Sequence, residues 1–453
     1  HKSFTDINYP RKIHSDTDFL WNILHNNLYF RNVNNIEGMW AFAQVNKHSG
    51  DLHLSRDRFG QKPLYYAYLK NSSSIAFSSS INTLLLLIDF KPKLNFEKLR
   101  NYLFLGFRSI NIDPETTFLE DIYSVRPGCS VIINNLLQKK TVSLFDNRRK
   151  DNKMFSYSES IDFLKSNFKK SVEDIIISDR PLALLLSGGI DSSYLYKTIK
   201  ELYPEKKLST YSYMNTIEGY DEEKNINTNL NYDYSHHTFI RNNELDIFDL
   251  WLELTKENMF PLPNQSAFSY ANLVKEISNN NDIVILSGVG ADEIFGGYYT
   301  HLISYVTDLF IKNKDDTRLT KWHDSGMYKT IRMKLLRDYR LYSDYTKSNI
   351  YGFHEYNLED SLLKHDNFSI KNRILEKVSS ITSDLLYYDL TKMTLPPALY
   401  VNDLISMYYS CESRAPYLCN RLVDFAIQLP NEYLFNDFYT KSILRDAASS
   451  IVS

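Results

Sequence analysis

The residues best suited to do chemistry stand together in the segment SGGIDSS, residues 187–193. The apolar run PLALLL comes directly before this segment, and a helix-like pattern follows it. Two adjacent glycines let a backbone turn sharply and approach a ligand closely, and the free N–H groups at a helix start favour negative charge. The serines add hydroxyl donors. The order of strand, glycine pair and helix therefore predicts an anion site, with phosphate as its occupant.

Asp191, inside this segment, indicates how a phosphate would be bound there. A carboxylate would repel a bare phosphate, so we expect a Mg²⁺ ion between the two groups. The segment also lacks the lysine that a Walker A loop carries, which indicates another class of phosphate-binding loop.

A second loop of the same kind is LSGVGADEIFGGY, residues 286–298. It follows another apolar strand pattern, DIVILS, and it combines glycines with the acids Asp292 and Glu293. The ends of two buried strands thus carry the two segments that could hold a charged ligand.

The first 145 residues show the patterns of a strand-rich region. Residues 38–69 hold two alternating apolar segments around a turn at 47–51, which predicts a hairpin. The other elements expected there are helices at 17–28 and 94–105 and strands at 74–80, 130–135 and 140–145.

From residue 157 onward the pattern changes. The continuous apolar run PLALLL is typical of a strand buried on both faces of a parallel sheet. Strands at 208–214 and 282–287 alternate with helical patterns at 157–176 and 194–202, which predicts a doubly wound α/β domain. Residues 299–400 are patterned mostly as helix.

Composition excludes several classes of protein. The 453 residues are enough for two or three domains, and the net charge of −3 argues against a nucleic-acid partner. The most apolar run, residues 76–90, is too short to cross a bilayer, so no membrane partner is expected. Three cysteines without metal-ligand spacing indicate a reducing, cytoplasmic setting.

The segment SGGIDSS resembles the signature of the PP-loop ATP pyrophosphatases, which cleave ATP to AMP and pyrophosphate. Residues 286–298 are similar to the corresponding loop of the asparagine synthetases, more than to other enzymes of that group. Residues 406–426 and 440–447 resemble C-terminal motifs of the same family, in which an Arg-Pro-Phe-Leu-Asp run is usual. Cys419 stands where that run often has Asp, and we attach no role to this difference at the sequence level.

The N-terminal part resembles the latter half of a class II glutamine amidotransferase domain. The matching segments are SDTD at 15–18, GMWAFA at 38–43 and RDRFGQKPLYY at 56–66. The resemblance implies a mixed α/β protein, beginning with a partial α+β, antiparallel-sheet amidotransferase domain of the Ntn type. A doubly wound parallel-sheet PP-loop domain with a helical C-terminal part follows it.

The expected division of the chain is residues 1–145 for the amidotransferase-like domain, 146–156 for a linker and 157–453 for the PP-loop domain. A surface turn inside one domain is the alternative for the linker. The first half of the amidotransferase domain and the C-terminal end of the PP-loop domain are missing by comparison with the family. We therefore expect the sequence to be a piece of a longer protein, and a domain that has lost glutamine hydrolysis is the alternative.

The resemblance also implies where ATP binds. The adenine is held in the family by backbone at positions matching Leu186, Tyr213 and Gly288, with Ser287 beside them. The positions that match the phosphate-binding residues are Ser187, Gly188, Gly189, Asp191, Ser192 and Ser193.

The expected catalytic residues are Lys441, Asp292 and Glu293. Asp191 and Asp292 match acids that bind Mg²⁺, although a turn-capping role for Asp292 is an alternative. Lys441 matches the lysine that neutralises charge on the leaving pyrophosphate, and a solvated surface lysine is the alternative. For Glu412 and Arg414 we favour a structural ion pair near the site.

Three departures from the family bear on function. The N-terminal cysteine nucleophile and the Arg and Asn-Gly-Glu segments of the glutamine pocket are absent from this sequence. Asp16 matches the residue that binds the glutamine amino group, and capping of the 17–28 helix is its alternative role. Val289 stands at the adenylate-formation position, where asparagine synthetases usually have an acid, so either Glu293 replaces that acid or the substrate is not aspartate.

The resemblance implies ATP-dependent formation of asparagine. A carboxylate, expected to be the aspartate side chain, attacks the α-phosphate of ATP, and ammonia from glutamine then attacks the adenylate. The alternative is an amide-forming relative, such as a β-lactam synthetase or lasso-peptide cyclase, that adenylates another carboxylate and has a non-hydrolysing N-terminal domain. A non-catalytic scaffold is a third hypothesis. The expected cofactors are ATP and Mg²⁺, the partners are these small molecules, and a homodimer is the expected assembly.

Overall fold

The structure of the chain is a computed structural model that describes residues 15–26, 28–107, 110–111, 113–149, 155–214, 223–231, 234–241, 247–262, 265–313, 317–325, 329 and 380–452. Structural statements below refer to these residues.

Two antiparallel sheets make up most of the N-terminal part. Their strand orders are β1-β2-β6-β7 and β4-β3-β5. The hairpin predicted around residues 47–51 is confirmed, because Val45 of β1 pairs with Leu52 of β2. The elements are α1 (Asp16–His25), α2 (Tyr29–Asn32), η2 (Val33–Asn35), β1 (Ala41–Val45), β2 (Leu52–Arg56), β3 (Tyr65–Tyr68), β4 (Ile75–Ser78), α3 (Ile81–Leu87), α4 (Phe96–Leu105), β5 (Tyr123–Ser124), β6 (Cys129–Ile133) and β7 (Lys139–Ser143).

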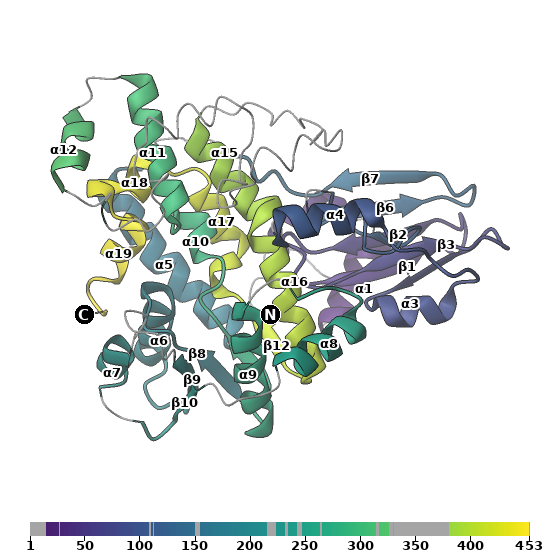
Figure 1. The fold of residues 1–453 in the computed structure, drawn as a ribbon, viewed down its shortest axis with the longest axis horizontal. Helices are drawn as coiled ribbons and strands as arrows, with labels where there is room; N and C mark the ends of the chain where they lie inside the picture. Colours follow the sequence, from purple (N-terminus) through teal and green to yellow (C-terminus); the bar gives the residue numbers. More distant parts are fainter. Residues whose placement is uncertain are drawn as a thin grey trace.

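The second part alternates strands and helices before it becomes mostly helical, as predicted. Residues 314–316, 326–328 and 330–379, within the segment expected to be helical, lie outside the described residues. Figure 1 shows its elements on the left and the antiparallel sheets on the right. The elements are α5 (Tyr157–Ile175), β8 (Leu182–Leu185), α6 (Ile190–Leu202), β9 (Ser209–Met214), α7 (Glu223–Leu230), β10 (His237–Arg241), α8 (Ile247–Asn258), α9 (Gln265–Asn279), β11 (Val284–Leu286), α10 (Ala291–Phe295), α11 (Tyr299–Lys312), α12 (Thr317–Ser325), α15 (Ile381–Tyr388), η6 (Asp389–Met393), α16 (Leu395–Tyr408), β12 (Glu412–Arg414), η7 (Pro416–Leu418), α17 (Asn420–Ala426), α18 (Asn431–Leu434), η8 (Asn436–Phe438) and α19 (Ser442–Ala448).

The five strands of the second part form one parallel sheet with the order β10-β9-β8-β11-β12. The chain starts in the middle at β8, adds β9 and β10 on one side, and then returns to place β11 and β12 on the other. The boundary between β8 and β11 is therefore the topological switch point, where open α/β sheets bind their ligands. Both glycine-rich loops follow these two strands, so the fold class expected from the sequence is confirmed.

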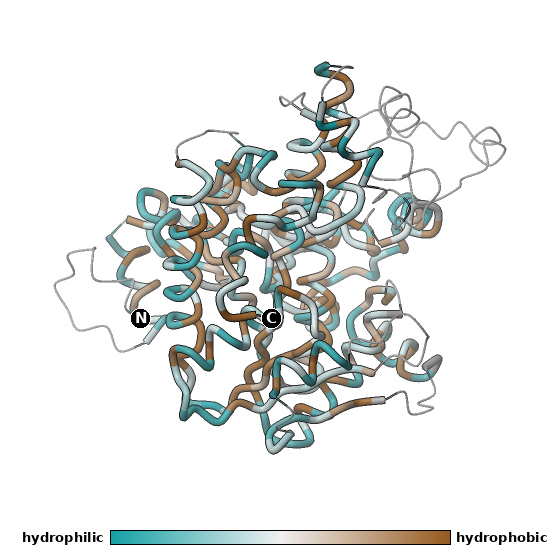
Figure 2. The backbone as a smooth tube through the Cα atoms, turned by 90° about the vertical axis from the view of Figure 1, so that its left-hand side faces the viewer, coloured by the Kyte–Doolittle hydropathy of each residue, from teal (hydrophilic) through white to brown (hydrophobic). Residues whose placement is uncertain are grey.

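Both faces of this sheet are covered, as the continuous apolar run of β8 predicts. Leu184 and Leu286 pack into a core with α5, α6 and the C-terminal helices, whereas Ala183 and Ile285 pack on the opposite face with α9. Along the helices, hydrophobic and hydrophilic positions alternate, as Figure 2 shows. Within the described ranges, no helix is both long and apolar enough to span a membrane.

Several predicted helix boundaries differ from the structure, and two of the differences bear on candidate site residues. Helix α6 begins at Ile190 and not at Tyr194, so Asp191 lies in its first turn. Helix α1 ends at His25 instead of residue 28, and Ser15 is its cap, because its hydroxyl accepts a hydrogen bond from the Asp18 N–H at 3.1 Å. The sequence-based alternative of a cap at Asp16 is therefore wrong.

Phe168 on α5 tests the core behind the phosphate loop. Its fully buried ring packs against Tyr194 and Tyr417, with ring centroids 4.6 and 4.7 Å apart. We expect Phe168→Ala to lower the free energy of unfolding by about 3–5 kcal/mol, because the surrounding side chains can only partly fill the cavity. Urea denaturation measures this loss. The control is Phe96→Ala, at a side chain 73% exposed, which should change stability by less than about 0.5 kcal/mol.

Candidate active site

Lys441 joins the two loops that the sequence singled out. Its Nζ lies 2.6 Å from Asp191 Oδ2 and 2.7 Å from Asp292 Oδ1. Asp191 is in the first turn of α6, Asp292 is on α10, and Lys441 directly precedes α19. Lys441 is only 6% exposed, so the solvated surface lysine considered from the sequence is excluded. The structure thus brings together the three residues assigned to metal binding and to the reacting phosphate.

Glycines make room for this cluster. A Cβ atom on Gly297 would lie 1.7 Å from Asp292 Oδ1 and 2.2 Å from Lys441 Cε. A Cβ atom on Gly288 would lie 2.9 Å from the Cβ atom of Asp191. The two loops can therefore approach each other only because both positions lack a side chain.

The first loop is held by hydrogen bonds of its own serines. The Ser187 N–H donates to Ser192 Oγ at 3.1 Å, and the Gly189 N–H donates to Ser187 Oγ at 3.3 Å. Gly188 has a φ of +80°, a conformation that L side chains rarely adopt. One tight turn beside Asp191 is consequently formed by Ser187, Gly188, Gly189 and Ser192.

Ser193 lies differently from its neighbours. Its buried Oγ accepts a hydrogen bond from Asn229 Nδ2 of α7 at 2.6 Å. The hydroxyl therefore faces the helix layer behind the loop. Its assignment to phosphate binding stays a prediction with this contact against it.

The backbone positions assigned to adenine lie around the same sheet edge. The Leu186 N–H donates to the Tyr211 carbonyl at 2.9 Å, and the Leu186 carbonyl accepts from Ser212 Oγ. The N–H of Leu186 thus already donates a hydrogen bond within the sheet. Tyr213 is half-buried near the end of β9, and Gly288 faces Asp191.

Two buried oxygen atoms near the cluster have no hydrogen-bond partner among the described residues: Asp191 Oδ1 and Ser287 Oγ. Such atoms are rare in folded proteins and indicate a missing ligand. Mg²⁺ commonly binds through one or two carboxylates together with substrate phosphates. In the described part of the chain, no group of three or more His, Cys, Asp or Glu residues could hold a metal ion alone. Asp191 and Asp292 therefore fit a Mg²⁺ ion that arrives with a phosphate ligand.

Burial and charge shift the pKa values in this cluster. Burial alone would lower the pKa of Lys441, but Asp191 and Asp292 outweigh burial and raise it, so Lys441 is a cation. Burial raises the pKa of Asp191 to about 6, against the opposing effect of Lys441. Lys441 thus faces two carboxyl groups that attract further positive charge.

Glu293 does not face the same way as Asp292. It is 4% exposed, and Tyr298 Oη donates a hydrogen bond to its Oε1 at 2.7 Å. Burial, followed by the charge of Asp292, raises the pKa of Glu293 to about 8. Burial therefore favours the protonated form of Glu293, and Tyr298 was not anticipated as its partner.

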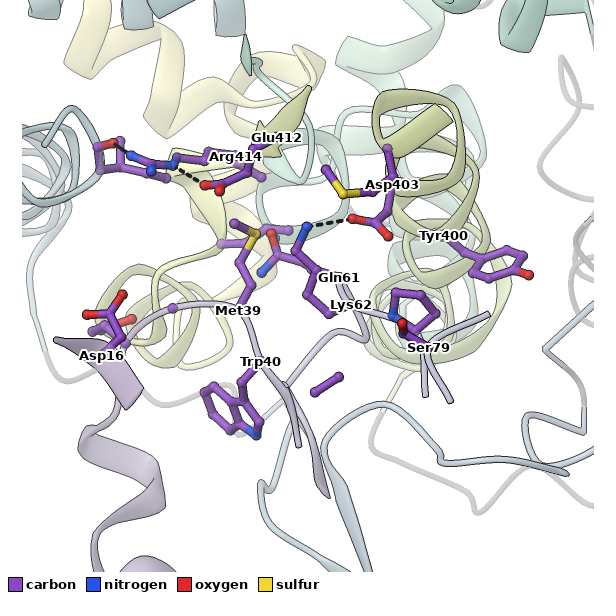
Figure 3. A pocket seen from close by; sticks show the side chains of 18 of the residues that line it. Asp16, Met39, Trp40, Gln61, Lys62, Ser79, Tyr400, Asp403, Glu412 and Arg414 are labelled. Atoms are coloured by element: carbon purple, nitrogen blue, oxygen red, sulfur yellow. Dashed lines mark hydrogen bonds and ion pairs between the residues drawn. The ribbon is translucent and has the colours of Figure 1, made fainter. Parts of the chain in front are cut away.

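Val289 belongs to the second glycine-rich loop and lies beside Gln61 of the N-terminal part. It packs against the hydrophobic core and lines a cavity of about 10 Å³ together with Ser287, Gln61 and Asp403. A cavity of about 1250 Å³ lies between the two parts of the chain, and it is also lined by Gln61 and Asp403 (Figure 3). Val289 thus lies next to the larger cavity, separated from it by those two side chains.

Asp16 lines the larger cavity, whereas Asp191, Asp292 and Lys441 do not. The structure therefore separates the residue assigned to glutamine from the residues assigned to ATP. The cavity wall also includes Glu412 and Arg414, whose ion pair of 2.6 Å confirms the predicted structural pair.

Two further contacts were missed from the sequence. Lys62 Nζ forms an ion pair of 2.7 Å with Asp403 Oδ1, as drawn in Figure 3. Tyr417 Oη donates a hydrogen bond to the Asp191 carbonyl at 2.9 Å. A signal for Tyr417 was present, because this hydroxyl-bearing residue stands where the similar motifs have Phe.

Glu293 gives a testable pH dependence of stability. Its pKa is about 8 in the folded chain and near 4.5 when unfolded, so the folded state binds the proton more tightly between these values. The stabilisation due to this proton is present below about pH 4.5 and is lost as the pH rises toward 8. Glu293→Gln keeps an acceptor for Tyr298 without titrating.

Melting temperatures of the wild type and Glu293→Gln, measured between pH 5 and 8, check this prediction. We expect the variant to gain stability relative to the wild type as the pH rises. A difference that stays constant over this range would contradict the raised pKa of Glu293.

Comparison with known proteins agrees with the two-part architecture. A family model described as asparagine synthase matches residues 164–453, and one described as glutamine amidotransferase domain matches residues 2–143. A solved NH3-dependent NAD synthetase from Campylobacter jejuni covers 43% of this chain and 95% of its own, at 12% identity and a TM-score of 0.22. That likeness is too slight to bear on the fold.

Curated relatives point in the same direction. A putative glutamine-hydrolyzing asparagine synthetase 2 of Methanocaldococcus jannaschii is 30% identical over 307 residues, which are 64% of this chain and 55% of the relative. The glutamine-hydrolyzing asparagine synthetase 1 of Bacillus subtilis is 28% identical over 458 residues, which are 92% of this chain and 66% of the relative. The chain thus spans between about half and two thirds of their length. Since the asparagine synthase model matches well over half of the sequence, the chain belongs to the asparagine synthase family.

Proposed function

We propose that the protein forms an amide with ATP, by adenylating a carboxylate and then transferring ammonia from glutamine to it. The observation that carries this proposal is the cluster of Lys441, Asp191 and Asp292 at the switch point of the parallel sheet. The relatives named as glutamine-hydrolyzing asparagine synthetases support aspartate as the carboxylate and asparagine as the product.

The geometry suggests how the chain's own residues act. The carboxylate attacks the α-phosphorus of ATP, the bond to the β-phosphate breaks, and pyrophosphate leaves with the electron pair. Lys441, kept cationic by two carboxylates, neutralises charge on this leaving group. A Mg²⁺ ion held by Asp191 and Asp292 would supply further charge neutralisation.

The nitrogen donor reaches the adenylate from the other part of the chain. Asp16 is proposed to bind the amino group of glutamine in the larger cavity. Ammonia then passes Gln61 and Asp403 toward Val289 and attacks the activated carbonyl, which releases AMP. The separation of Asp16 from Lys441 supports a division into two sites.

A second candidate rests on Val289. Its apolar side chain can neither take a proton nor accept a hydrogen bond, and Glu293 is hydrogen-bonded to Tyr298. An enzyme that adenylates another carboxylate, in the manner of β-lactam synthetases or lasso-peptide cyclases, would not need an acid at that position. The amidotransferase match of residues 2–143 favours the glutamine-dependent reaction over this candidate.

The remaining assignments are proposals as well. A cytoplasmic location is supported by three cysteines that form no disulfide. The division at residues 146–156 and a homodimer stay predictions.

Pyrophosphate release tests the proposed reaction. We expect the protein made from its complete gene to release pyrophosphate from Mg-ATP and ammonium only when aspartate is present, with asparagine as product. Asp191→Asn should lower this release by at least about 100-fold while the melting temperature stays near that of the wild type. Unchanged turnover in Asp191→Asn would contradict the assigned ATP site.

Val289→Glu separates the two candidates. If only the acid is missing from an aspartate site, the variant should raise aspartate-dependent turnover severalfold over the wild type in the same assay. Unchanged turnover, with ATP binding retained, would indicate that the pocket accepts another carboxylic acid. Val289→Gln, which adds similar volume without an acid, is the matched control.

A further inference from the structure

Helix α17 begins without a cap from its own segment. Cys419 occupies the N-cap position and makes no side-chain hydrogen bond there. The first N–H groups of a helix need acceptors, which Asp, Asn, Ser or Thr at this position usually provide. A cysteine thiol is only a weak hydrogen-bond acceptor, so the first N–H groups of α17 need a stronger acceptor from elsewhere.

Glu37, from the N-terminal part, supplies that acceptor. Its Oε2 accepts from the Asn420 N–H at 2.7 Å, and its Oε1 accepts from the Arg421 N–H at 3.3 Å. Asn420 Nδ2 in turn donates to the Ile36 carbonyl at 2.7 Å. A carboxylate of one part of the chain thus holds the first turn of a helix in the other.

The residues just before this turn support both ATP loops. Tyr417 Oη donates to the carbonyl of Asp191. The Leu418 side chain packs so closely on Gly290 that a Cβ atom there would lie 2.4 Å from Leu418 Cδ2. Helix α17 itself packs against α10, which carries Asp292. The start of α17 is therefore connected to the supports of both metal-binding acids.

We propose that Glu37 is a positioning residue for the ATP site: it holds the start of α17, and through Tyr417 and Leu418 it keeps the two ATP loops in place. This inference rests on the proposed ATP site. It links the amidotransferase part to nucleotide binding through one side chain, and Glu37 also lines the larger cavity between the parts.

The chain offers a matched control in Asp424. Its Oδ1 lies 2.7 Å from Arg58 Nη2, so this ion pair also joins the N-terminal part to α17. Asp424 lies a full turn after the helix start, and its side chain is 49% exposed. Asp424→Ala removes a contact between the parts and leaves the first turn of the helix capped.

The test is the affinity of the full-length protein for Mg-ATP, measured by titration calorimetry. We expect Glu37→Ala to weaken binding about fivefold to tenfold and Asp424→Ala to change it by less than about twofold. Glu37→Gln, which keeps one acceptor oxygen, should fall between Glu37→Ala and the wild type. If Glu37→Ala does not fold, the affinity of Glu37→Gln tests the inference in its place.

A rescue variant separates positioning from general support of the interface. Cys419→Asp places a preferred capping residue at the start of α17, so adding it to Glu37→Ala should bring the affinity back to within about twofold of the wild type.

Three results would overturn the inference. They are wild-type affinity in Glu37→Ala, an equal loss in Asp424→Ala, and a weakened Glu37→Ala that Cys419→Asp does not restore. A wild-type protein that binds no Mg-ATP would contradict the proposed function itself and remove this inference with it.

Discussion

The candidate active site depends on one ammonium group buried between two carboxylates. Lys441 lies within 2.7 Å of both Asp191 and Asp292, which come from the ends of two neighbouring parallel strands. Two carboxylates this close would repel each other, and an unpaired buried charge is strongly destabilising. The ammonium group of the lysine reduces the repulsion between the carboxylates and pairs with their buried charges. A metal ion that arrives with a phosphate ligand would neutralise the same two carboxylates.

The rest of the local structure follows from this arrangement. Gly288 and Gly297 are required because any side chain would occupy the space of Asp191, Asp292 or Lys441. Tyr417 and Leu418 support the loops from behind, and Glu37 supports the segment that carries them. The site is thus stabilised by contacts that reach from the cluster into the N-terminal part.

The position of the candidate site could be predicted from the sequence because its signals are local. A buried strand, a glycine pair and an acid at a helix start stand within a dozen residues, and the chain order places two such units at one sheet edge. What local signals do not give is the direction of a side chain. Ser193 is one of three serines in its segment, yet only tertiary packing turns it toward Asn229. Glu293 adjoins Asp292, yet its side chain is buried and accepts a hydrogen bond from Tyr298, and burial raises its pKa.

Contacts between the two parts could not be predicted from the sequence for a similar reason. Glu37 and Asn420 are 383 positions apart, and neither belongs to a pattern that indicates the other.

Lys441 and Asp191 are 250 positions apart, and this separation has a consequence for the order in which the site forms during synthesis. On the ribosome, both acidic loops emerge long before the lysine that balances them. The nascent chain therefore lacks the cation that joins the two acids until synthesis has passed Lys441.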